Sequence, residues 1–538
     1  MTTYLTLLFL VALSAAVSTS FAAFVSINCG SSEPYFDVQD SLNWTGDGDY
    51  VHNGVPQLVN SFYGAGPILS TLRVFPSLQK NCYTINNLQN GERVLVRASF
   101  YYGNYDGKHS PPEFDLLIDG SHLRTMSLQK YADNAYLITE IIYVVNGNAT
   151  SFCLARTLPN QLPFINALEL RSLGPKMYNR VGSKSFLLLR NRVAQGANQT
   201  IRRPDDPYDR FWFPNVPDDQ SSHLEVVASE AATIDVSSAE DQPPPAVLRT
   251  AIASTGTRVP LALDTNLKAE GPIYINVYFS EVLRLDSTQK RSIQLYIDDR
   301  PYLEPIIPPF GSVSEACITN ITAAPNTTFT AQASSNSTLP PLLNAYEVYA
   351  VVDAQPYRTR KKDVQGLMAL QTAFSVLQLW TGDPCLPLPY SWEWIECNTA
   401  AMPQVIALNL SGFGLLGSLP DFSSMDALQT IDLHNNNLEG PIPEFFGSFP
   451  NLTLLVTNNC INGRSCPPLI SPSPSPSLSP IEAPPPSVMP TSSPGTPLPS
   501  NSTPSHSGQN RNIAKLPIIL EALIQILLLS LLLISYFY

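Results

Sequence analysis

The amino-acid sequence predicts a mainly β protein, in which two tandem β-sandwich domains of the jelly-roll type are followed by a short repeat solenoid, a disordered Pro/Ser-rich stalk and a C-terminal hydrophobic helix. Three observations predict the folded part. Segments of the first copy recur in the second at a nearly constant offset, apolar residues alternate within them, and leucines recur further on at a much shorter offset. Alternation with period two indicates half-buried strands, whereas leucines with a period of about 20–29 residues indicate a solenoid.

A signal peptide is expected over residues 1–22. Leu5–Val17 is mostly apolar, and Ser20–Ala22 supplies the small residues of a cleavage site. Nine Asn-x-Ser/Thr sequons suit a secreted glycoprotein, and three of them within Asn320–Thr338 indicate a surface loop. The sequons lie at Asn43, Asn148, Asn198, Asn320, Asn326, Asn336, Asn409, Asn451 and Asn501.

The composition is acidic and poor in charge. The 538-residue chain has 44 acidic and 31 basic residues, a formal net charge of −13 and 14% charged residues, whereas 44% are hydrophobic. No long basic run is present, so nucleic acid is not an expected partner. The six histidines are scattered, and Gly-x-Ser-x-Gly, His-Glu-x-x-His and phosphate-loop motifs do not occur. We therefore expect no enzyme activity, no metal site and no cofactor.

The first part of the folded chain is a tandem duplication. Phe114–Gly120 is similar to Ile293–Asp299, and two further pairs of segments recur in the same order at nearly the same offset. Such a pattern indicates a copied domain, so we assign two similar domains to residues 23–175 and 176–355. Many short strands with frequent turns predict a sandwich or jelly roll for each copy.

A candidate ligand-binding surface lies at the end of one predicted strand. In Val94–Tyr102, alternation places Phe100 and Tyr102 on the core face, which leaves Tyr101 for the opposite face. Tyr101 and Tyr105 are therefore the candidate residues for stacking against a sugar. The competing interpretation is that these aromatic side chains pack within the protein, as aromatic residues in strands usually do.

A cluster of carboxylates marks the junction between the two copies. Its members are Asp205, Asp206, Asp209 and Arg210. Carboxylate oxygens are the ligands that calcium prefers, so a calcium site is one interpretation. The favoured interpretation is an interdomain turn whose carboxylates form hydrogen bonds and pair with Arg202 and Arg203.

Leu379–Asn398 holds three of the five tryptophans together with Cys385 and Cys397. A redox site needs close cysteines beside thiolate-stabilising groups, and a zinc site needs four ligands, so neither suits this stretch. A disulfide between the two cysteines, covering the exposed end of a repeat array, accounts for both residue types. An amphipathic helix is expected just before, where Val364, Leu367, Met368, Gln371 and Phe374 recur. Residues 356–403 are assigned as an N-terminal cap.

Leucine-rich repeats are expected over residues 404–466. Leu408, Leu410 and Leu415 align with Ile431, Leu433 and Leu438 at one constant offset. Asn436 has the position at which an asparagine bonds the backbone of the turn. Two and a half such units cannot bury a stable core alone, so both ends need a cover. A disulfide between Cys460 and Cys466 is expected at the far end.

The C-terminal segments predict an anchored stalk. More than one residue in three of Pro467–Pro504 is proline, and such a segment cannot form a packed core, so residues 467–512 are expected to be extended. Residues 513–538 are apolar to the end. Small residues, a polar spacer and a terminal apolar tail match a GPI-attachment signal, and a retained single-pass helix is the alternative. Either places the protein at the plasma membrane with an extracellular folded part.

The remaining cysteines are assigned from their places in the duplication. Cys82 and Cys153 both fall in the first copy and are expected to pair. Cys29 is then left with Cys317, a pairing that follows by elimination alone.

Several motifs together resemble one family. Gly382–Cys385 resembles the Gly-Asp-Pro-Cys motif of plant receptors that join malectin-like domains to leucine-rich repeats. Ile27–Gly30, Leu72–Pro76, Asn81–Tyr83, Tyr102–Gly107, Phe114–Leu116, Ala167–Leu170 and Arg203–Trp212 resemble segments of plant malectin-like domains. The resemblance implies a tandem malectin-like ectodomain followed by a short leucine-rich array. Its relatives are often receptor kinases, but no kinase follows here, so signalling would need a transmembrane partner.

These observations together predict a receptor-like cell-surface protein without a kinase. It is expected to bind a cell-wall carbohydrate, a peptide or a receptor ectodomain through its malectin-like and leucine-rich modules. A transmembrane receptor kinase is the expected co-receptor. The alternative is a structural or carbohydrate-binding glycoprotein of the cell wall.

Overall fold

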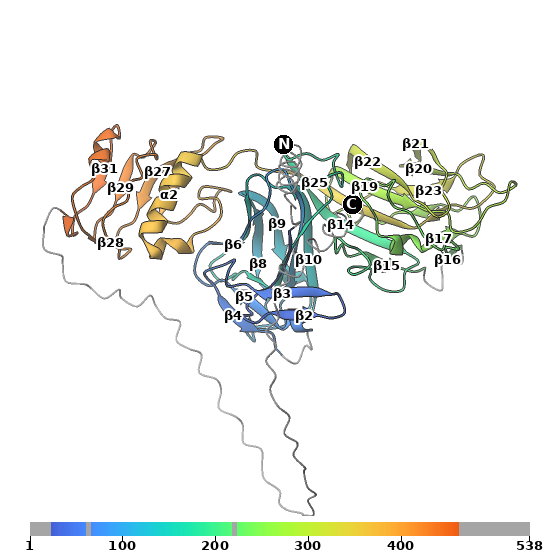
Figure 1. Ribbon diagram of the computed structural model, residues 1–538, viewed down its shortest axis with the longest axis horizontal. Helices are drawn as coiled ribbons and strands as arrows, with labels where there is room; N and C mark the ends of the chain where they lie inside the picture. The colour runs from blue at the N-terminus through green and yellow to red at the C-terminus, as the bar shows by residue number, and fades with distance from the viewer. Residues whose placement is uncertain (1–22, 61–65, 218–222, 462–538) are drawn as a thin grey trace, which may run out of the picture. The chain divides into compact units, whose positions relative to one another are not determined.

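The computed structural model describes residues 23–60, 66–217 and 223–461, and strands dominate it (Figure 1). The prediction of a mainly β protein is confirmed. The predicted signal peptide, stalk and hydrophobic tail lie outside the described residues, as do Cys466 and Asn501. Within the described ranges, no helix is both long and apolar enough to span a membrane.

One sheet of eleven strands runs through most of the described chain. Its order is β2-β3-β1-β13-β7-β10-β14-β25-β19-β22, with β15 beside β14. The strands are β1 (Phe24–Asn28), β2 (Tyr35–Asp37), β3 (Leu42–Gly46), β7 (Arg93–Tyr101), β10 (Tyr136–Val144), β13 (Ala167–Ser172), β14 (Ser185–Gln195), β15 (Phe213–Asn215), β19 (Gly271–Phe279), β22 (Ser314–Ala323) and β25 (Ala345–Asp353). Neighbours are antiparallel except where β1 meets β3 and β14 meets β15.

Smaller sheets accompany each half of this main sheet. Two have four strands, in the orders β6-β11-β8-β9 and β18-β23-β20-β21, and two have three strands, in the orders β12-β5-β4 and β16-β17-β24. The strands are β4 (Val55–Leu58), β5 (Thr71–Val74), β6 (Lys80–Asn86), β8 (Glu113–Ile118), β9 (Ser121–Ser127), β11 (Ala149–Arg156), β12 (Phe164–Ile165), β16 (Leu224–Ala228), β17 (Thr250–Ser254), β18 (Leu261–Ala262), β20 (Ile293–Ile297), β21 (Arg300–Ile306), β23 (Phe329–Ala333) and β24 (Leu342–Leu343).

The strand order of the first half recurs in the second. The series β1-β13-β7-β10 corresponds to β14-β25-β19-β22 along the main sheet. The registers correspond as well: Leu168 pairs with Ala98, and Tyr346, the counterpart of Leu168 in the second copy, pairs with Val277. The repeated segments of the sequence therefore occupy equivalent positions in two similar strand sets, which we call the first set (residues 24–172) and the second set (residues 185–353).

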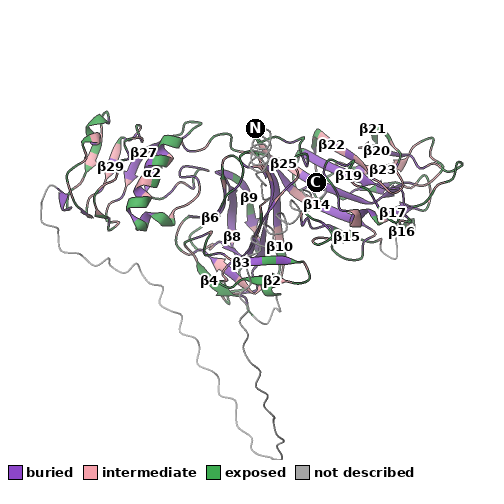
Figure 2. Cartoon of the chain, in the orientation of Figure 1, coloured by how far each residue is buried: buried purple, intermediate pink, exposed green. Residues whose placement is uncertain are grey.

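Each strand set has an apolar core between its main-sheet strands and its smaller sheets. In the first set, the rings of Phe100 and Phe114 lie 5.7 Å apart, and those of Phe114 and Phe164 lie 5.8 Å apart. In the second set, Ile275, Phe279 and Ala331 are fully or almost fully buried. Figure 2 shows buried residues along the strands of both sets. Burial of these side chains is the main favourable term in folding.

The C-terminal part, from Lys361 to Ile461, is a short β-solenoid behind one helix. Its main sheet has the order β26-β27-β29-β31, and β27, β29 and β31 are parallel, with Leu408 beside Ile431 and Ile431 beside Leu454. The elements are α2 (Lys361–Ala373), β26 (Ile395–Cys397), β27 (Val405–Asn409), β28 (Leu416–Gly417), β29 (Thr430–Asp432), β30 (Asn437–Leu438) and β31 (Thr453–Leu455). Short 3-10 turns in the chain are η2 (Pro67–Leu69), η3 (Leu128–Lys130), η4 (Pro245–Leu248), η5 (Ser375–Leu379) and η6 (Glu444–Ser448).

Asn436 shows why the solenoid turn needs an asparagine. Its Nδ2 donates to the carbonyl oxygens of Leu410 and Leu433 at 2.8 and 2.9 Å, and its Oδ1 accepts from the Leu415 amide at 3.0 Å. These bonds satisfy buried backbone groups of successive turns, which would otherwise cost free energy. Leu367 and Leu370 of α2 are fully buried against this solenoid core, whereas Met368 is exposed.

Candidate functional site

A ladder of buried charges crosses the main sheet where the two strand sets meet. Charges of alternating sign stand on the five neighbouring strands β13, β7, β10, β14 and β25, as Glu169, Arg97, Glu140, Arg192 and Glu347. Glu140 accepts hydrogen bonds from Nη2 of Arg192 at 2.6 Å and from Nε of Arg97 at 3.0 Å. Each of the five residues is at most 2% exposed, so each charge depends on its neighbours for compensation. This seam ladder joins the two sets.

The carboxylate cluster after the first set belongs to the same region. The ion pairs of its turn are Arg202–Asp209 and Arg210–Asp206, and Asp205 is exposed. Burial raises the pKa of Asp209, but attraction by Arg97, Arg171 and Arg202 outweighs burial and holds this pKa well below its usual value. No group of three or more His, Cys, Asp or Glu among the described residues is arranged to hold a metal ion. The cluster is therefore a buried ionic turn.

A cavity of about 710 Å³ opens beside the seam ladder and is lined in part by residues of strands β10 and β14. We call it the seam cavity. Its lining consists of Tyr136, Leu137, Ile138, Glu140, Leu189, Arg190, Asn191, Arg192, Thr200, Arg202, Phe211, Phe213 and Asn266. Two of the lining rings reach solvent, since Tyr136 is 44% and Phe213 42% exposed. The cavity thus combines accessible aromatic side chains with three arginines and a single carboxylate.

Two arginines at this place have no counter-ion within the described ranges. Arg190 lines the seam cavity, and its buried Nε has no hydrogen-bond partner among the described residues. Burial lowers the pKa of Arg190, and the positive charge of Arg124 on β9 lowers it further. Burial also lowers the pKa of Arg124. An uncompensated, partly desolvated cation costs free energy that a bound anion would recover.

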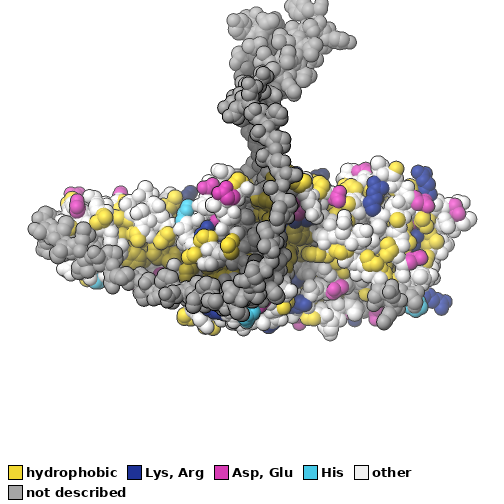
Figure 3. Space-filling model, turned by 90° about the horizontal axis from the view of Figure 1, so that it is seen from below, with side chains coloured by type: hydrophobic (Ala, Val, Ile, Leu, Met, Phe, Trp, Pro, Cys, Tyr) yellow, Lys and Arg dark blue, Asp and Glu magenta, His cyan; other side chains and the backbone are white. Residues whose placement is uncertain are grey.

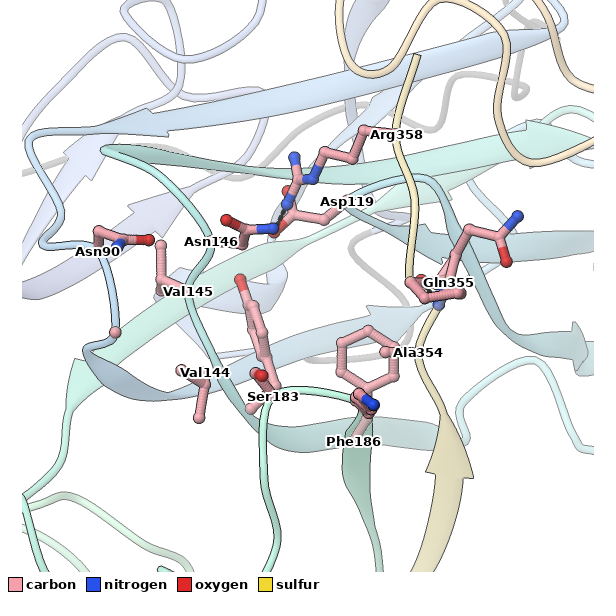
Figure 4. A pocket seen from close by; sticks show the side chains of 15 residues that line it. Asn90, Asp119, Val144, Val145, Asn146, Ser183, Phe186, Ala354, Gln355 and Arg358 are labelled. Atoms are coloured by element: carbon pink, nitrogen blue, oxygen red, sulfur yellow. Dashed lines mark hydrogen bonds and ion pairs between the residues drawn. The ribbon is translucent and has the colours of Figure 1, made fainter. Parts of the chain in front are cut away.

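A second cavity, of about 380 Å³, lies where the chain leaves the second set. We call it the joint cavity (Figure 4). Arg358 pairs with Asp119 at 3.0 Å on one side, and the ring of Phe186 lies on the other side. The amide of Gln355 donates to Oγ of Ser121 at 2.9 Å, which fixes the connecting segment against the first set. The joint cavity has a polar rim and no aromatic ring that stands free in solvent, because Tyr143 and Phe186 are only 3% and 4% exposed.

The Gly-Asp-Pro-Cys stretch docks on the first set. Nζ of Lys80 on β6 donates to the carbonyl oxygens of Asp383 and Leu386 at 2.6 and 2.9 Å, and the hydroxyl of Tyr390 donates to Asp115 at 2.6 Å. These contacts join segments that lie far apart in the sequence. The Gly-Asp-Pro-Cys stretch and the residues after it are therefore fastened to the first set.

Gly382 is required at this docking site. Its φ of +77° lies in the left-handed region, and a Cβ there would come within 2.6 Å of Sγ of Cys82. Only glycine tolerates both the dihedral angle and the close approach to the Cys82–Cys153 disulfide. The first residue of the motif is thus explained by packing against the first set.

We predict that Lys80 gives the docked cap a pH-dependent stability. Burial lowers the pKa of Lys80 from 10.5 to about 8, so between these values the unfolded chain holds a proton that the folded chain has released. The folded state therefore gains stability as the pH rises through this window. The unfolding free energy of wild type minus that of Lys80→Met should increase by on the order of 3 kcal/mol from pH 7.5 to 10.5. Urea unfolding at several pH values measures it.

The matched control for this prediction is Lys268→Met. Lys268 is exposed, so its removal should leave the pH dependence of unfolding unchanged. Parallel pH profiles for Lys80→Met and wild type would show that Lys80 is not desolvated in the folded protein.

On the face shown in Figure 3, charged side chains are scattered singly or in small groups among hydrophobic ones. Exposed apolar side chains on the short strands β2 and β4 include Phe36, at 53%, and Leu58, at 73%. Single exposed apolar residues are normal on protein surfaces, so these two side chains by themselves do not define a site.

The comparison with known families identifies the strand sets. Residues 27–351, more than half of the chain, match the malectin-like domain family. The chain belongs to the malectin-like family. The resemblance inferred from the sequence motifs is thereby confirmed.

Curated relatives of this malectin-like chain come from Arabidopsis thaliana. An uncharacterised protein is 37% identical over 337 residues, which cover 62% of this chain and 66% of that protein. A probable leucine-rich-repeat receptor-like serine/threonine-protein kinase is 29% identical over 415 residues, 74% of this chain and 45% of the kinase. The chain thus spans about half the length of the receptor-like kinases that it matches.

Solved structures similar to the malectin-like chain include the ANX2 ectodomain from Arabidopsis thaliana. It is 17% identical, covers 61% of this chain and 97% of its own, and has a TM-score of 0.49. The plant receptor-like kinase FER is 18% identical, covers 62% and 97%, and has the same TM-score.

The cysteines of the malectin-like chain largely follow the sequence predictions. Disulfides join Cys82 to Cys153, which face each other on β6 and β11, and Cys385 to Cys397. Cys460 is disulfide-bonded, and its predicted partner Cys466 lies outside the described residues.

The pairing of Cys29 with Cys317 is wrong, because both are free thiols. Cys29 follows β1, and Cys317 lies on β22, which is seven strands away in the main sheet. At about 4.8 Å per strand that distance is on the order of 30 Å, whereas a disulfide needs Cα atoms within about 7 Å. Elimination failed here because the two free cysteines belong to different strand sets.

The candidate sugar-stacking tyrosines are not displayed as predicted. Phe100 and Tyr102 are buried as the alternation predicts, but Tyr101 is also buried, at 5% exposed. The main sheet is covered on both faces at β7, so alternation does not expose the second face. Tyr105 is partly buried, and its ring packs against those of Tyr102 and Phe164.

The seam ladder is the feature that sequence reasoning missed. Its members look like isolated charges within apolar strands. One signal could have found it: Glu169 and Glu347 occupy equivalent positions of the two copies. A charge kept at the same buried place in both copies indicates a partner on the neighbouring strand, here Arg97 and Arg192.

Proposed function

We propose that this protein is a receptor-like protein of the cell surface, which binds an extracellular ligand through its malectin-like part and acts with a transmembrane receptor kinase. The observation that carries the proposal is the family match over residues 27–351, together with the alignment to plant receptor-like kinases. No enzymatic domain is evident in these matches. The seam cavity supports a binding role, because its arginines and accessible rings suit a ligand better than they suit isolated packing.

The proposed domain organisation follows the strand sets. Residues 23–175 and 176–355 are proposed as two malectin-like jelly-roll domains, and the repeated strand order supports this division. Residues 356–403 are proposed as the cap and residues 404–466 as leucine-rich repeats, which the evenly spaced parallel strands β27, β29 and β31 support. The main sheet continues from one proposed domain into the next, so we expect them to move as one body.

We further propose that residues 1–22 are a signal peptide and that residues 467–538 supply a Pro/Ser-rich stalk and a membrane anchor. A GPI anchor is the favoured form, with a single-pass helix as the other. Treatment of intact membranes with a GPI-specific phospholipase tests this: release of the mature protein is expected, and retention in the membrane would favour the helix.

The proposed function is tested by chemical cross-linking on intact plant cells that express the full chain with an epitope tag. A transmembrane receptor kinase is expected among the cross-linked products, at a level above that of a tagged secreted protein with the same C-terminal residues 467–538. Equal recovery from both cell lines would contradict a receptor-like role.

A further inference from the structure

The backbone hydrogen bonding between neighbouring strands of the main sheet is interrupted at the seam cavity. On the edge of β14 opposite β25, β10 pairs only at Leu187 and Leu188, and β15 pairs only at Val193–Gln195. Between them, residues 189–192 have no strand partner on that edge among the described residues. The carbonyl of Arg190 accepts from Nδ2 of Asn266 at 3.1 Å, so this edge is only partly open to a further strand. At about 3.3 Å per residue the interruption is about 13 Å long, the length of four residues of an extended chain.

The side chains around the interruption favour a negatively charged ligand. Arg190 lies within it and has no ion pair in the described ranges, and Arg124 stands near enough to repel it. Nη1 of Arg192 is buried without a hydrogen-bond partner among the described residues, although the other nitrogens of this guanidinium are paired with Glu140 and Glu347. The net charge of the whole chain is −13, so this local excess of positive charge runs against its overall balance.

Accessible rings flank the same place. Tyr136 stands on β10, and Phe213 begins β15, so that one ring lies on each strand that borders the interruption. Both rings are partly exposed in spite of their size. Large rings at low entropic cost are typical anchors for a partner side chain.

We propose that the seam cavity binds an extended acidic segment of a partner protein, which lies along the open edge of β14 and places a carboxylate on Arg190. An extended backbone fits a strand edge because its amides and carbonyls repeat at the spacing of the ladder, and alternate side chains then reach the flanking rings. An acidic sugar has the same negative charge as an acidic peptide, but it has no peptide backbone that could pair with the edge of β14. The inference rests on the proposed function, because it names the chemistry of one ligand of the receptor-like ectodomain.

The test is fluorescence anisotropy with a labelled peptide, Glu-Val-Glu-Val-Glu-Val, and the full chain in detergent. Saturable binding is expected, and Arg190→Glu should weaken it by about tenfold or more, since one charge-assisted contact is replaced by repulsion. The matched control is Arg258→Glu, which reverses the charge of an exposed arginine in the loop after β17. Arg190→Gln is the second variant, and its unfolding temperature should be no lower than that of wild type, because the change removes a partly desolvated cation without a counter-ion among the described residues.

Two further probes decide the nature of the ligand. A Glu-Pro alternating peptide has the charge but lacks every second amide hydrogen, and its proline φ angles are fixed near −65°, away from the φ of a β-strand, so it should bind at least about tenfold more weakly. A galacturonate hexamer presents carboxylates on a sugar. Preferential binding of this hexamer, or equal binding of the Glu-Pro peptide, would overturn the peptide assignment.

Equal effects of the Arg190→Glu and Arg258→Glu variants, or no binding at millimolar peptide, would overturn the site itself. Cross-linking of the Arg190→Gln variant to a receptor kinase separates this outcome from the function. If wild type does not bind the acidic peptide and the Arg190→Gln variant still cross-links to a receptor kinase, the seam-cavity inference is wrong. The receptor-like role would then still be supported.

Discussion

Replacing Glu347 with alanine is expected to destabilise the malectin-like part by about 3–5 kcal/mol, the cost of leaving buried charges unpaired. Glu347 is fully buried and accepts from Nε of Arg192 at 2.6 Å. It also accepts from the hydroxyls of Tyr178, Tyr278 and Tyr349 at 3.0, 2.8 and 2.8 Å. Alanine would leave Nε of Arg192 and three buried hydroxyls without this acceptor, although Nη2 of Arg192 keeps its pair with Glu140. Urea unfolding of the full chain measures the loss.

The matched control is Glu304→Ala on β21, which removes an exposed carboxylate and should change the unfolding free energy by no more than about 0.5 kcal/mol. The pH dependence gives a second readout. Burial raises the pKa of Glu347, but Arg192 and Arg210 outweigh burial and hold this pKa below 4.5. Its contribution is therefore present above pH 4.5 and is lost as the pH falls through the folded-state pKa. Equal stabilities of the Glu347 and Glu304 variants would contradict the seam ladder.

Replacing Cys385 with serine is expected to destabilise the cap and solenoid by about 3 kcal/mol, the value for opening a loop of this length. The bond to Cys397 closes a stretch with a sequence separation of 12, and it lies in the core that Trp392 and Trp394 also fill. Residues 361–461 should become protease-sensitive first, while both strand sets stay resistant. Limited proteolysis with mass spectrometry checks this order.

The strand sets provide the internal control for this experiment, because their own disulfide, Cys82–Cys153, is untouched by the change. The docking contacts predict one further effect. When the cap loosens, the carbonyls of Asp383 and Leu386 leave Lys80, so the amine of Lys80 should become reactive toward acylating reagents. Unchanged protease resistance in the Cys385→Ser protein would contradict the capping role.

The sequence predicts the parts that depend on periodicity. Alternation locates β7, the constant offset between the copies relates β8 to β20, and the shorter leucine period locates the parallel strands β27 and β29. The same patterns fail where burial is not set by one strand alone. Tyr101 is buried because other segments cover the second face of β7, which no local pattern reports.

Contacts between distant segments are the other part that the sequence does not predict. Neither the charge of Lys80 nor the carbonyl oxygen of Asp383 indicates that the two meet in the folded chain. Likewise, the seam cavity exists because β10 and β14 separate after Leu187 and Leu188, a property of how the sets are joined. The function was inferred from motifs and family resemblance, whereas the unpaired Arg190 became visible only in the folded chain.

Under the proposed function, the folded modules bind the partner and the stalk does not. The most direct measurement is the yield of cross-linked receptor kinase on intact cells for three chains: the full chain, a chain without Pro467–Pro504, and a chain whose residues 23–461 are replaced by an unrelated secreted domain. The proposed function predicts that the yield survives loss of the stalk and falls to background when the folded modules are replaced. A yield that disappears with the stalk and survives replacement of the folded modules would contradict it.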